Sequence, residues 1–161
     1  MPATPITVTT RYTPPGRRAY NWLTAVAAYP GAPTRAEINA GSDLTAQLAE
    51  VNGFELTGDS ADAPDLGGGF VAQVPARVTA SDSEFVFYAS SNSNDIRTVL
   101  PRGTAGYVLI LPEGDVPTQK CEVWPATVKS MFIDASIEDP GKIHVQLSIT
   151  RLPIQNLTIP A

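Results

Sequence analysis

Very few side chains of this sequence could carry out chemistry, and they begin with a single histidine and a single cysteine. His144 and Cys121 are the only residues of their types among 161. A catalytic nucleophile needs a base beside it, usually a histidine, and nothing in the sequence places these two residues together. His144 falls on the polar side of an alternating segment, which favours a solvated strand residue. Cys121 lies in an apolar run and is interpreted as a small core residue.

Three acidic residues could contact a cation. Asp59, Asp62 and Asp65 are spaced by three and interrupted by Pro64. A calcium loop of the EF-hand type needs oxygen ligands at alternate positions and a terminal glutamate. A solvated loop is therefore the preferred interpretation, with a weak calcium contact as the alternative.

Two other motifs also lack the residues that their chemistry requires. The run Gly67-Gly68-Gly69 is not followed by the Lys-Ser/Thr of a phosphate-binding loop. The pair Glu138-Asp139 could serve a glycosidase, but it precedes Pro140-Gly141 and is more simply a turn. We therefore predict that the chain is not an enzyme and holds no metal centre and no cofactor.

The charge balance disfavours a nucleic-acid-binding protein. The chain has 11 basic and 16 acidic residues, a net charge of −5, whereas binding to phosphates requires clustered lysine and arginine. The one basic cluster, Arg17-Arg18, reads as a solvated turn. No apolar run is long enough to cross a bilayer, and the first residues do not resemble a signal peptide. We expect no membrane association and assembly in a cytoplasm.

Length and composition predict one mainly β domain over residues 1–161. The 12 glycines and 15 prolines are spread along the chain and favour many short segments joined by turns. Alternating or continuous apolar runs predict about seven to eight strands. These are residues 20–27, 43–50, 54–57, 70–79, 84–89, 107–111, 120–129 and 142–152.

Several local features are expected within these elements. The apolar side of 70–79 (Phe70, Ala72, Val74, Ala76 and Val78) should be buried, and Pro75 on the other side suggests an edge strand or a bulge. A phase change near Trp124-Pro125 predicts a second bulge.

One helix and one shorter helical turn are expected beside the strands. Ile96, Val99 and Leu100 have helical spacing behind the capping candidates Asn92, Ser93 and Asn94. A turn of helix over 33–40 should have Thr34 as N-cap, Glu37 completing a capping box and Gly41 as its stop.

Three segments have no obvious local packing partner. They are the proline-rich start (1–16), the acidic and glycine-rich segment 52–69, which reads as a long flexible loop, and the end of the chain (152–161). The last contains Leu152, Ile154, Leu157 and Ile159, interrupted by Pro153 and Pro160. Such apolar arms usually lie on a neighbour or on their own domain.

The sequence also resembles a known family. The segment from Pro33 to Thr45, the helix at 94–100 with the following Arg102-Gly103-Thr104-Ala105-Gly106-Tyr107-Val108, and the late strands ending in Ile149-Thr150-Arg151-Leu152-Pro153 resemble the major tail (tail tube) proteins of long-tailed actinobacterial phages. The likeness extends from about Tyr20 onward.

This resemblance implies a fold and an assembly. The fold would be a β-sandwich or barrel with one flanking helix, shared with contractile-injection tubes. Copies would form hexameric rings whose strands line a lumen, and the rings would stack through the loop 52–69 and the arms 1–16 and 152–161. We expect Asp59, Asp62 and Asp65 to pair between rings with Arg35, Arg97 or Arg102. Deletion of residues 59–65 should then leave a folded monomer that cannot polymerise.

The same resemblance implies partners and a location. The partners would be further copies of the chain, a tape-measure protein, and tail-tip or terminator proteins, in a virion assembled in the host cytoplasm. DNA would pass through the lumen without specific binding, since acids facing inward would repel phosphate. A head-tail connector, terminator or decoration protein remains an alternative. A carbohydrate- or peptide-binding β-sandwich is another, although its exposed aromatic platform is not visible.

Overall fold

The fold is a curled antiparallel sheet with a long hairpin attached. A computed structural model describes residues 16–91, 95–134 and 140–161. These contain ten strands, so the mainly β class is confirmed, with more strands than expected. The larger sheet consists of β1 (Ala19–Leu23), β2 (Ser42–Asp43), β3 (Leu48–Asn52), β6 (Ser83–Tyr88), β7 (Ala105–Leu111), β8 (Lys120–Asp134), β9 (Lys142–Ile149) and β10 (Ile154–Thr158).

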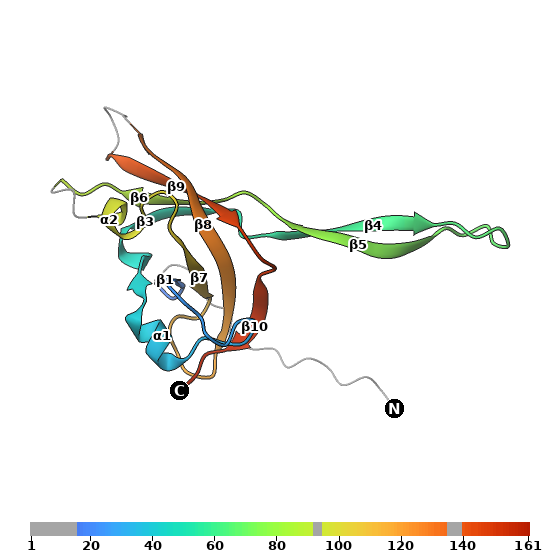
Figure 1. The fold of residues 1–161 in the computed structure, drawn as a ribbon, viewed down its shortest axis with the longest axis horizontal. Helices are drawn as coiled ribbons and strands as arrows, with labels where there is room; N and C mark the ends of the chain where they lie inside the picture. The colour runs from blue at the N-terminus through green and yellow to red at the C-terminus, as the bar shows by residue number, and fades with distance from the viewer. Residues whose placement is uncertain (1–15, 92–94, 135–139) are drawn as a thin grey trace.

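This sheet curves until its two ends meet (Figure 1). Its strand order is β2-β1-β7-β8-β9-β6-β3, with β10 also paired to β8. Tyr20 of β1 and Phe85 of β6 lie far apart in that order, yet their ring centroids are 5.8 Å apart. A segment leads from β2 through a 3₁₀ turn, η1 (Thr45–Gln47), to β3. It crosses the opening between the two ends of the sheet. The result is a small barrel.

Apolar residues pack on both sides of the barrel wall. The interior cluster contains Trp22, Phe85, Phe87, Trp124, Val145 and their neighbours. The second cluster lies outside β1, β7 and β8, where Ile38 of the helix α1 (Arg35–Ala40) and Ile159 cover Leu109, Leu111 and Val123. Both faces of β7 and of the first half of β8 are therefore buried.

The predicted helix and the predicted helical turn are both present as short helices. The capping box of α1 is confirmed, with Thr34 as N-cap, Glu37 as its partner and the backbone N–H of Gly41 bonded to the Ile38 carbonyl. The second helix, α2 (Ile96–Val99), has Asp95 as its N-cap. The predicted caps Asn92, Ser93 and Asn94 lie outside the described residues. Ile96 and Leu100 pack into the interior cluster.

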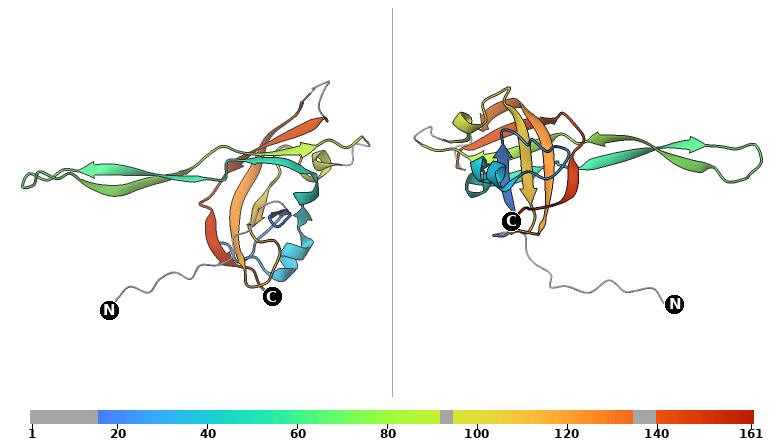
Figure 2. Two further views of the ribbon diagram at one scale, coloured as in Figure 1. Left: turned by 180° about the vertical axis from the view of Figure 1, so that it is seen from behind. Right: turned by 60° about the horizontal axis from the view of Figure 1, so that its bottom comes forward.

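The second sheet is a hairpin of two strands, β4 (Leu56–Ala63) and β5 (Ala72–Ala80), that projects from the barrel (Figure 2). The prediction of a flexible loop over 52–69 was therefore wrong for 56–63. The predicted burial of one side of 70–79 was also wrong, because all nine residues of β5 are exposed. The expected irregularity at Pro75 is confirmed, since the register shifts between the pairs Gly58–Val78 and Ser60–Pro75.

Two further details differ from expectation. Residues 43–50 do not form one strand, because η1 turns the chain from the β1 side of the opening to the β6 side. The irregularity in β8 lies between Val128 and Ser130 and not at Trp124-Pro125. The apparent phase change at 124–125 arises because Cys121 and Val123 face the outer cluster whereas Trp124 and Ala126 face the interior.

A glycine pair tests how tightly β1 packs on β7. A Cβ at Gly106 would lie 2.6 Å from the Leu23 carbonyl oxygen and 2.7 Å from the Trp22 ring, whereas nothing lies within 4 Å of one at Gly58. We expect Gly106→Ala to lower the free energy of unfolding by about 1–3 kcal/mol, measured by denaturant titration. Gly58→Ala is the matched control and should leave it nearly unchanged. Equal effects would contradict the packing described.

Candidate assembly surfaces

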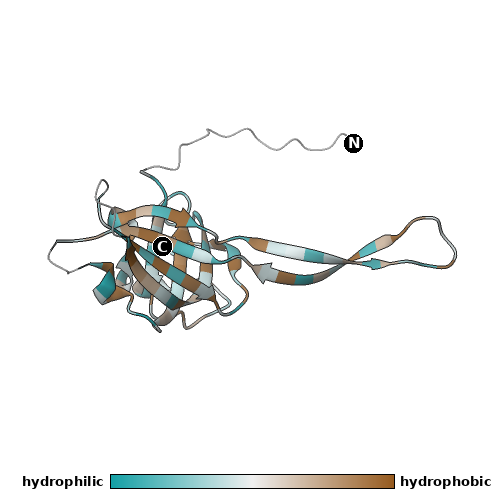
Figure 3. Ribbon diagram, turned by 90° about the horizontal axis from the view of Figure 1, so that it is seen from above, coloured by the Kyte–Doolittle hydropathy of each residue, from teal (hydrophilic) through white to brown (hydrophobic). Residues whose placement is uncertain are grey.

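The β4–β5 hairpin exposes more apolar side chain than a free strand pair in water normally does. Leu66 is fully exposed, and Phe70 retains 80% of its accessible surface. Val71, Val74 and Val78 are about half exposed. Figure 3 shows these apolar segments running out along the hairpin. Because an isolated two-stranded hairpin is marginally stable at best, this element is suited to pack against another molecule.

The pairing register gives the outer half of the hairpin two different sides. Ala61 pairs with Val74 and Ala63 with Ala72, which places four small apolar residues on one side. Asp62 pairs with Gln73 on the other side, where the Gln73 Nε2 donates to the Asp62 Oδ1 at 3.1 Å. The small side allows close approach of another backbone, and the opposite side is polar.

The base of the hairpin is fixed to the barrel. Gly53 and Phe54 both have positive φ angles, +80° and +58°, a conformation that is strained for phenylalanine. The Phe54 ring lies 5.0 Å from Phe85 and 5.5 Å from Trp124, measured between centroids. Its backbone N–H donates to the Ser83 Oγ at 3.1 Å. The aromatic contacts thus hold the residue from which the hairpin leaves the barrel.

The three predicted acids all lie on this hairpin, at successive distances from the barrel. Asp59 sits beside the register shift, Asp62 bonds to Gln73, and the Asp65 Oδ1 accepts from the Gly67 backbone N–H at 2.9 Å. All three residues are exposed. The described residues contain no group of three or more potential metal ligands.

Two of the three predicted cations are already paired within the chain. The Arg35 Nη2 donates to the Asp115 Oδ2 at 2.8 Å, and the Arg97 Nη2 donates to the Asp95 Oδ2 at 2.8 Å. Arg102 lies in the exposed turn after α2 and forms no ion pair with a described residue. Arg102 is therefore the best placed of the three for a contact with another subunit.

The end of the chain packs largely on its own domain. Ile154 and Leu157 belong to β10, which pairs with the first residues of β8, and Ile159 is buried in the outer cluster. Leu152 alone among the four predicted arm residues is clearly exposed, at 59%. The predicted arm 1–16 lies outside the described residues except for Gly16.

His144 and Cys121 are not brought together. The His144 Nδ1 lies 3.2 Å from the Glu84 Oε1, and its ring stacks on Phe132 at 4.6 Å. Cys121 is buried at the opposite end of β8, where burial raises the pKa of its thiol to about 11. A protonated thiol far from a base is a poor nucleophile, so this pair has no catalytic geometry.

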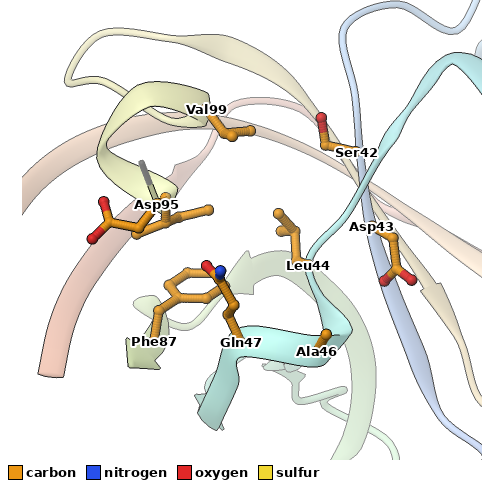
Figure 4. Close-up of a pocket in the computed structure, with 9 residues that line it drawn as sticks. Ser42, Asp43, Leu44, Ala46, Gln47, Phe87, Asp95 and Val99 are labelled. Atoms are coloured by element: carbon orange, nitrogen blue, oxygen red, sulfur yellow. The ribbon is translucent and has the colours of Figure 1, made fainter. Parts of the chain in front are cut away.

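A cavity of about 250 Å³ lies where the sheet ends meet, between η1 and α2. Leu44, Phe87 and Val99 surround it, and the Asp95 carboxylate points away from Leu44 (Figure 4). That carboxylate instead accepts hydrogen bonds from the Ser90 backbone N–H and the Arg97 side chain. The lining thus mixes apolar residues with the polar Ser42, Asp43 and Gln47, and none of the lining residues is a histidine, lysine or cysteine.

Comparison with known families identifies the family of this chain. A family model described as phage tail tube protein matches residues 1–161. The chain belongs to this family. It is therefore a structural component of a phage tail and a virion protein, in a family that is typically non-enzymatic.

The fold also matches a solved assembly. A chain of the anti-feeding prophage (AFP) baseplate, determined by cryo-EM with 6-fold symmetrisation, superposes with a TM-score of 0.58 at 10% sequence identity. The match covers 94% of this chain and 98% of the other. At this identity the likeness concerns the fold. No curated protein sequence matches. Within the described residues, no helix is long and apolar enough to cross a membrane.

The buried Asp95 carboxylate should make stability depend on acidic pH. Its hydrogen bonds from Arg97 lower its pKa from 3.8 to about 2. The unfolded chain therefore takes up a proton at higher pH than the folded one, and this contribution is lost as pH falls from about 4 to about 2. Asp95→Asn should reduce the free energy of unfolding at pH 7 by roughly 1 kcal/mol and flatten its pH dependence in this window. An unchanged pH profile in denaturant titrations would contradict this role.

Proposed function

We propose that this chain polymerises as stacked hexameric rings into the tail tube of a long-tailed actinobacterial phage, a conduit for genome delivery. The observation that carries this proposal is the projecting hairpin, whose two strands bury almost nothing against their own chain. Sixteen of the seventeen strand residues are exposed. Such a surface needs a contact partner, and identical copies supply one at every position in a stack. The fold is similar to a chain of a 6-fold symmetrised baseplate, which supports six subunits in each ring.

In this assembly the hairpin carries the axial contacts. Its apolar tip, Leu66 and Phe70, and its small-residue side would pack on the adjacent ring. The acids Asp59, Asp62 and Asp65 would then meet basic groups of that ring. Arg102 is the preferred partner, because Arg35 and Arg97 already hold carboxylates of their own chain. Leu152 is the remaining exposed contact of the chain's last segment.

The outer face of β8, β9, β6 and β3 suits the wall of a lumen. It is mostly polar, with Tyr88 and Phe132 as exposed aromatic residues. The Lys142 Nζ donates to Glu50 at 3.1 Å, and the His144 Nδ1 lies 3.2 Å from a Glu84 carboxylate oxygen. The Ser130 Oγ donates to Gln146 at 2.7 Å on the same face. Within the described residues, this face therefore has no basic cluster that would bind phosphate, and DNA could pass along it without being bound.

The remaining parts of the proposal follow from this role. The chain would catalyse nothing and would need no cofactor. Besides its own copies, it would contact a tape-measure protein in the lumen and tail-tip or terminator proteins at the ends of the tube. Assembly would take place in the host cytoplasm.

Electron microscopy separates this function from its rivals. A terminator or connector would stop at a single ring, whereas a tube protein should give long hollow rods at high concentration or with its tail-tip initiator. A ligand-binding module would stay monomeric. Trp22 and Trp124 are buried and cannot form the platform that such a module needs. A chain that is monomeric under both conditions would overturn the proposal.

The hairpin tip provides a direct test. Leu66→Ser with Phe70→Ser removes the two most exposed apolar side chains of the hairpin and should abolish rods, while the unfolding midpoint stays within about 2 °C because neither residue is in the core. Sedimentation and microscopy give the readout. Val116→Ser, on an exposed turn residue of the barrel, is the matched control and should assemble normally. If the double variant still forms rods, the hairpin tip is not part of the contact between rings.

The acidic residues make a separate prediction about salt. If Asp59, Asp62 and Asp65 form ion pairs between rings, raising salt from about 0.05 to 0.5 M should raise the critical concentration for assembly several-fold, because salt screens exposed charges. The triple Asp→Asn variant should assemble less well at low salt and respond less to added salt. Light scattering measures both effects. A salt response identical to that of the unchanged chain would exclude these acids from the contact.

A further inference from the structure

Strand β3 has a hydrogen-bonding edge that no described residue occupies. It pairs with β6 on one side and ends the strand order of the sheet. On its other side, β1 reaches only as far as Ala19, opposite the end of β7 at Leu111. Beyond this point the barrel wall is open. Unpaired edges of this kind are the places where a further strand adds to a sheet.

A slot of about 270 Å³ lies along this opening. Its lining includes the apolar residues Val51, Phe54 and Ile110, together with Tyr20. Carboxylates also line it: Glu55 and Glu122, with Arg18 as the one basic residue. Glu55 is exposed. The slot therefore suits an extended segment with apolar residues on one side and a positive charge on the other.

One segment of the chain outside the described residues has this pattern. In residues 6–13, Ile6, Val8, Thr10 and Tyr12 alternate with Thr7, Thr9, Arg11 and Thr13. Alternation of this kind, rich in β-branched residues, is typical of a strand. The whole of 1–15 contains one arginine and no acid, so its charge complements the carboxylates of the slot.

We propose that residues 6–13 of a second copy of the chain add to the free edge of β3 and fill this slot. Ile6, Val8 and Tyr12 then face Val51, Phe54 and Ile110, and Arg11 meets Glu55. Each subunit completes the barrel wall of its neighbour. This inference rests on the proposed ring assembly and adds to it a strand exchanged between subunits.

The chain's own geometry makes a neighbour the better donor. The Leu44 backbone N–H donates to the Tyr20 carbonyl at 2.8 Å. Beyond this bond η1 turns the chain away from β1, so the register of β1 and β2 does not continue along β3. Gly16 has φ +80° and lies in a turn, which diverts the chain at this point. We therefore take a second copy as the donor, and a donor segment in the same chain is the competing outcome of the experiment below.

Cysteine cross-linking of full-length chains tests the exchange. Thr7→Cys, Thr9→Cys and Thr13→Cys are each mixed with an Asn52→Cys chain under assembly conditions and mild oxidation. Asn52 is exposed at the end of β3, and a disulfide needs Cα atoms about 4.4–6.8 Å apart. We expect a disulfide-linked pair of chains from at least one of the three mixtures. Ala27→Cys, exposed on the α1 side of the barrel, replaces Asn52→Cys in the control and should give none.

The outcomes separate this inference from the proposed function. Rods without a cross-link to position 52 above the control overturn the strand exchange and leave the tube intact. A cross-link formed only within one chain, in a dilute double variant, also overturns it. Cross-linked pairs in the absence of rods support the exchange while the tube proposal fails. Absence of both rods and cross-links overturns both.

A charge reversal tests the predicted Arg11–Glu55 contact. Arg11→Glu and Glu55→Arg should each raise the critical concentration for assembly about tenfold, and the double variant should return it to within about threefold of the unchanged chain. The unfolding midpoint of Glu55→Arg should stay unchanged, because Glu55 is exposed. Additive losses in the double variant would overturn the pairing of these two residues.

Discussion

The fold depends on strand β8, whose side chains pack into both apolar clusters and whose two edges are both hydrogen-bonded to other strands. Cys121 and Val123 face the outer cluster, whereas Trp124, Ala126 and Val128 face the barrel interior. One edge pairs with β7, and the other pairs first with β10 and then with β9. Every other strand of the large sheet except β2 and β3 is placed by contact with β8 or with its immediate neighbours.

A proline in the middle of such a strand needs an explanation, because it cannot donate to the ladder. The Pro125 carbonyl accepts from the Thr150 N–H at 3.0 Å. In a strand, the N–H and C=O of one residue point to the same edge, so the missing donor of Pro125 also points toward Thr150. There β9 has ended at Ile149 and β10 has not begun. The proline thus sits where one partner strand replaces the other, so only the last bond of the β8–β9 ladder is missing.

The sequence predicted those elements whose signals come from their own residues. The alternation of Ile143, Val145 and Leu147 was sufficient to predict β9, because one side of that strand faces a single core. The capping box of Thr34 and Glu37 was sufficient to predict the start of α1, because its hydrogen bonds are local. The same alternation in β5 was misread, because a pattern shows that one side is apolar without showing what covers it. Pairing of β10 with β8 and the intrachain partners of Arg35 and Arg97 depend on contacts distant in sequence, which no spacing revealed.

The exposed hairpin and the free edge of β3 are both oriented by the same corner of the barrel. The hairpin and the β3 edge both begin at Gly53 and Phe54, and Phe54 is held by Phe85 and Trp124 against a backbone strain of about 1–3 kcal/mol. Fixing this corner to the core orients both features before any contact with a neighbour. Preorganisation reduces the conformational entropy that association must overcome. A small subunit can therefore present an exposed hairpin and an open edge in defined directions, because its barrel core does not depend on contacts made by either of them.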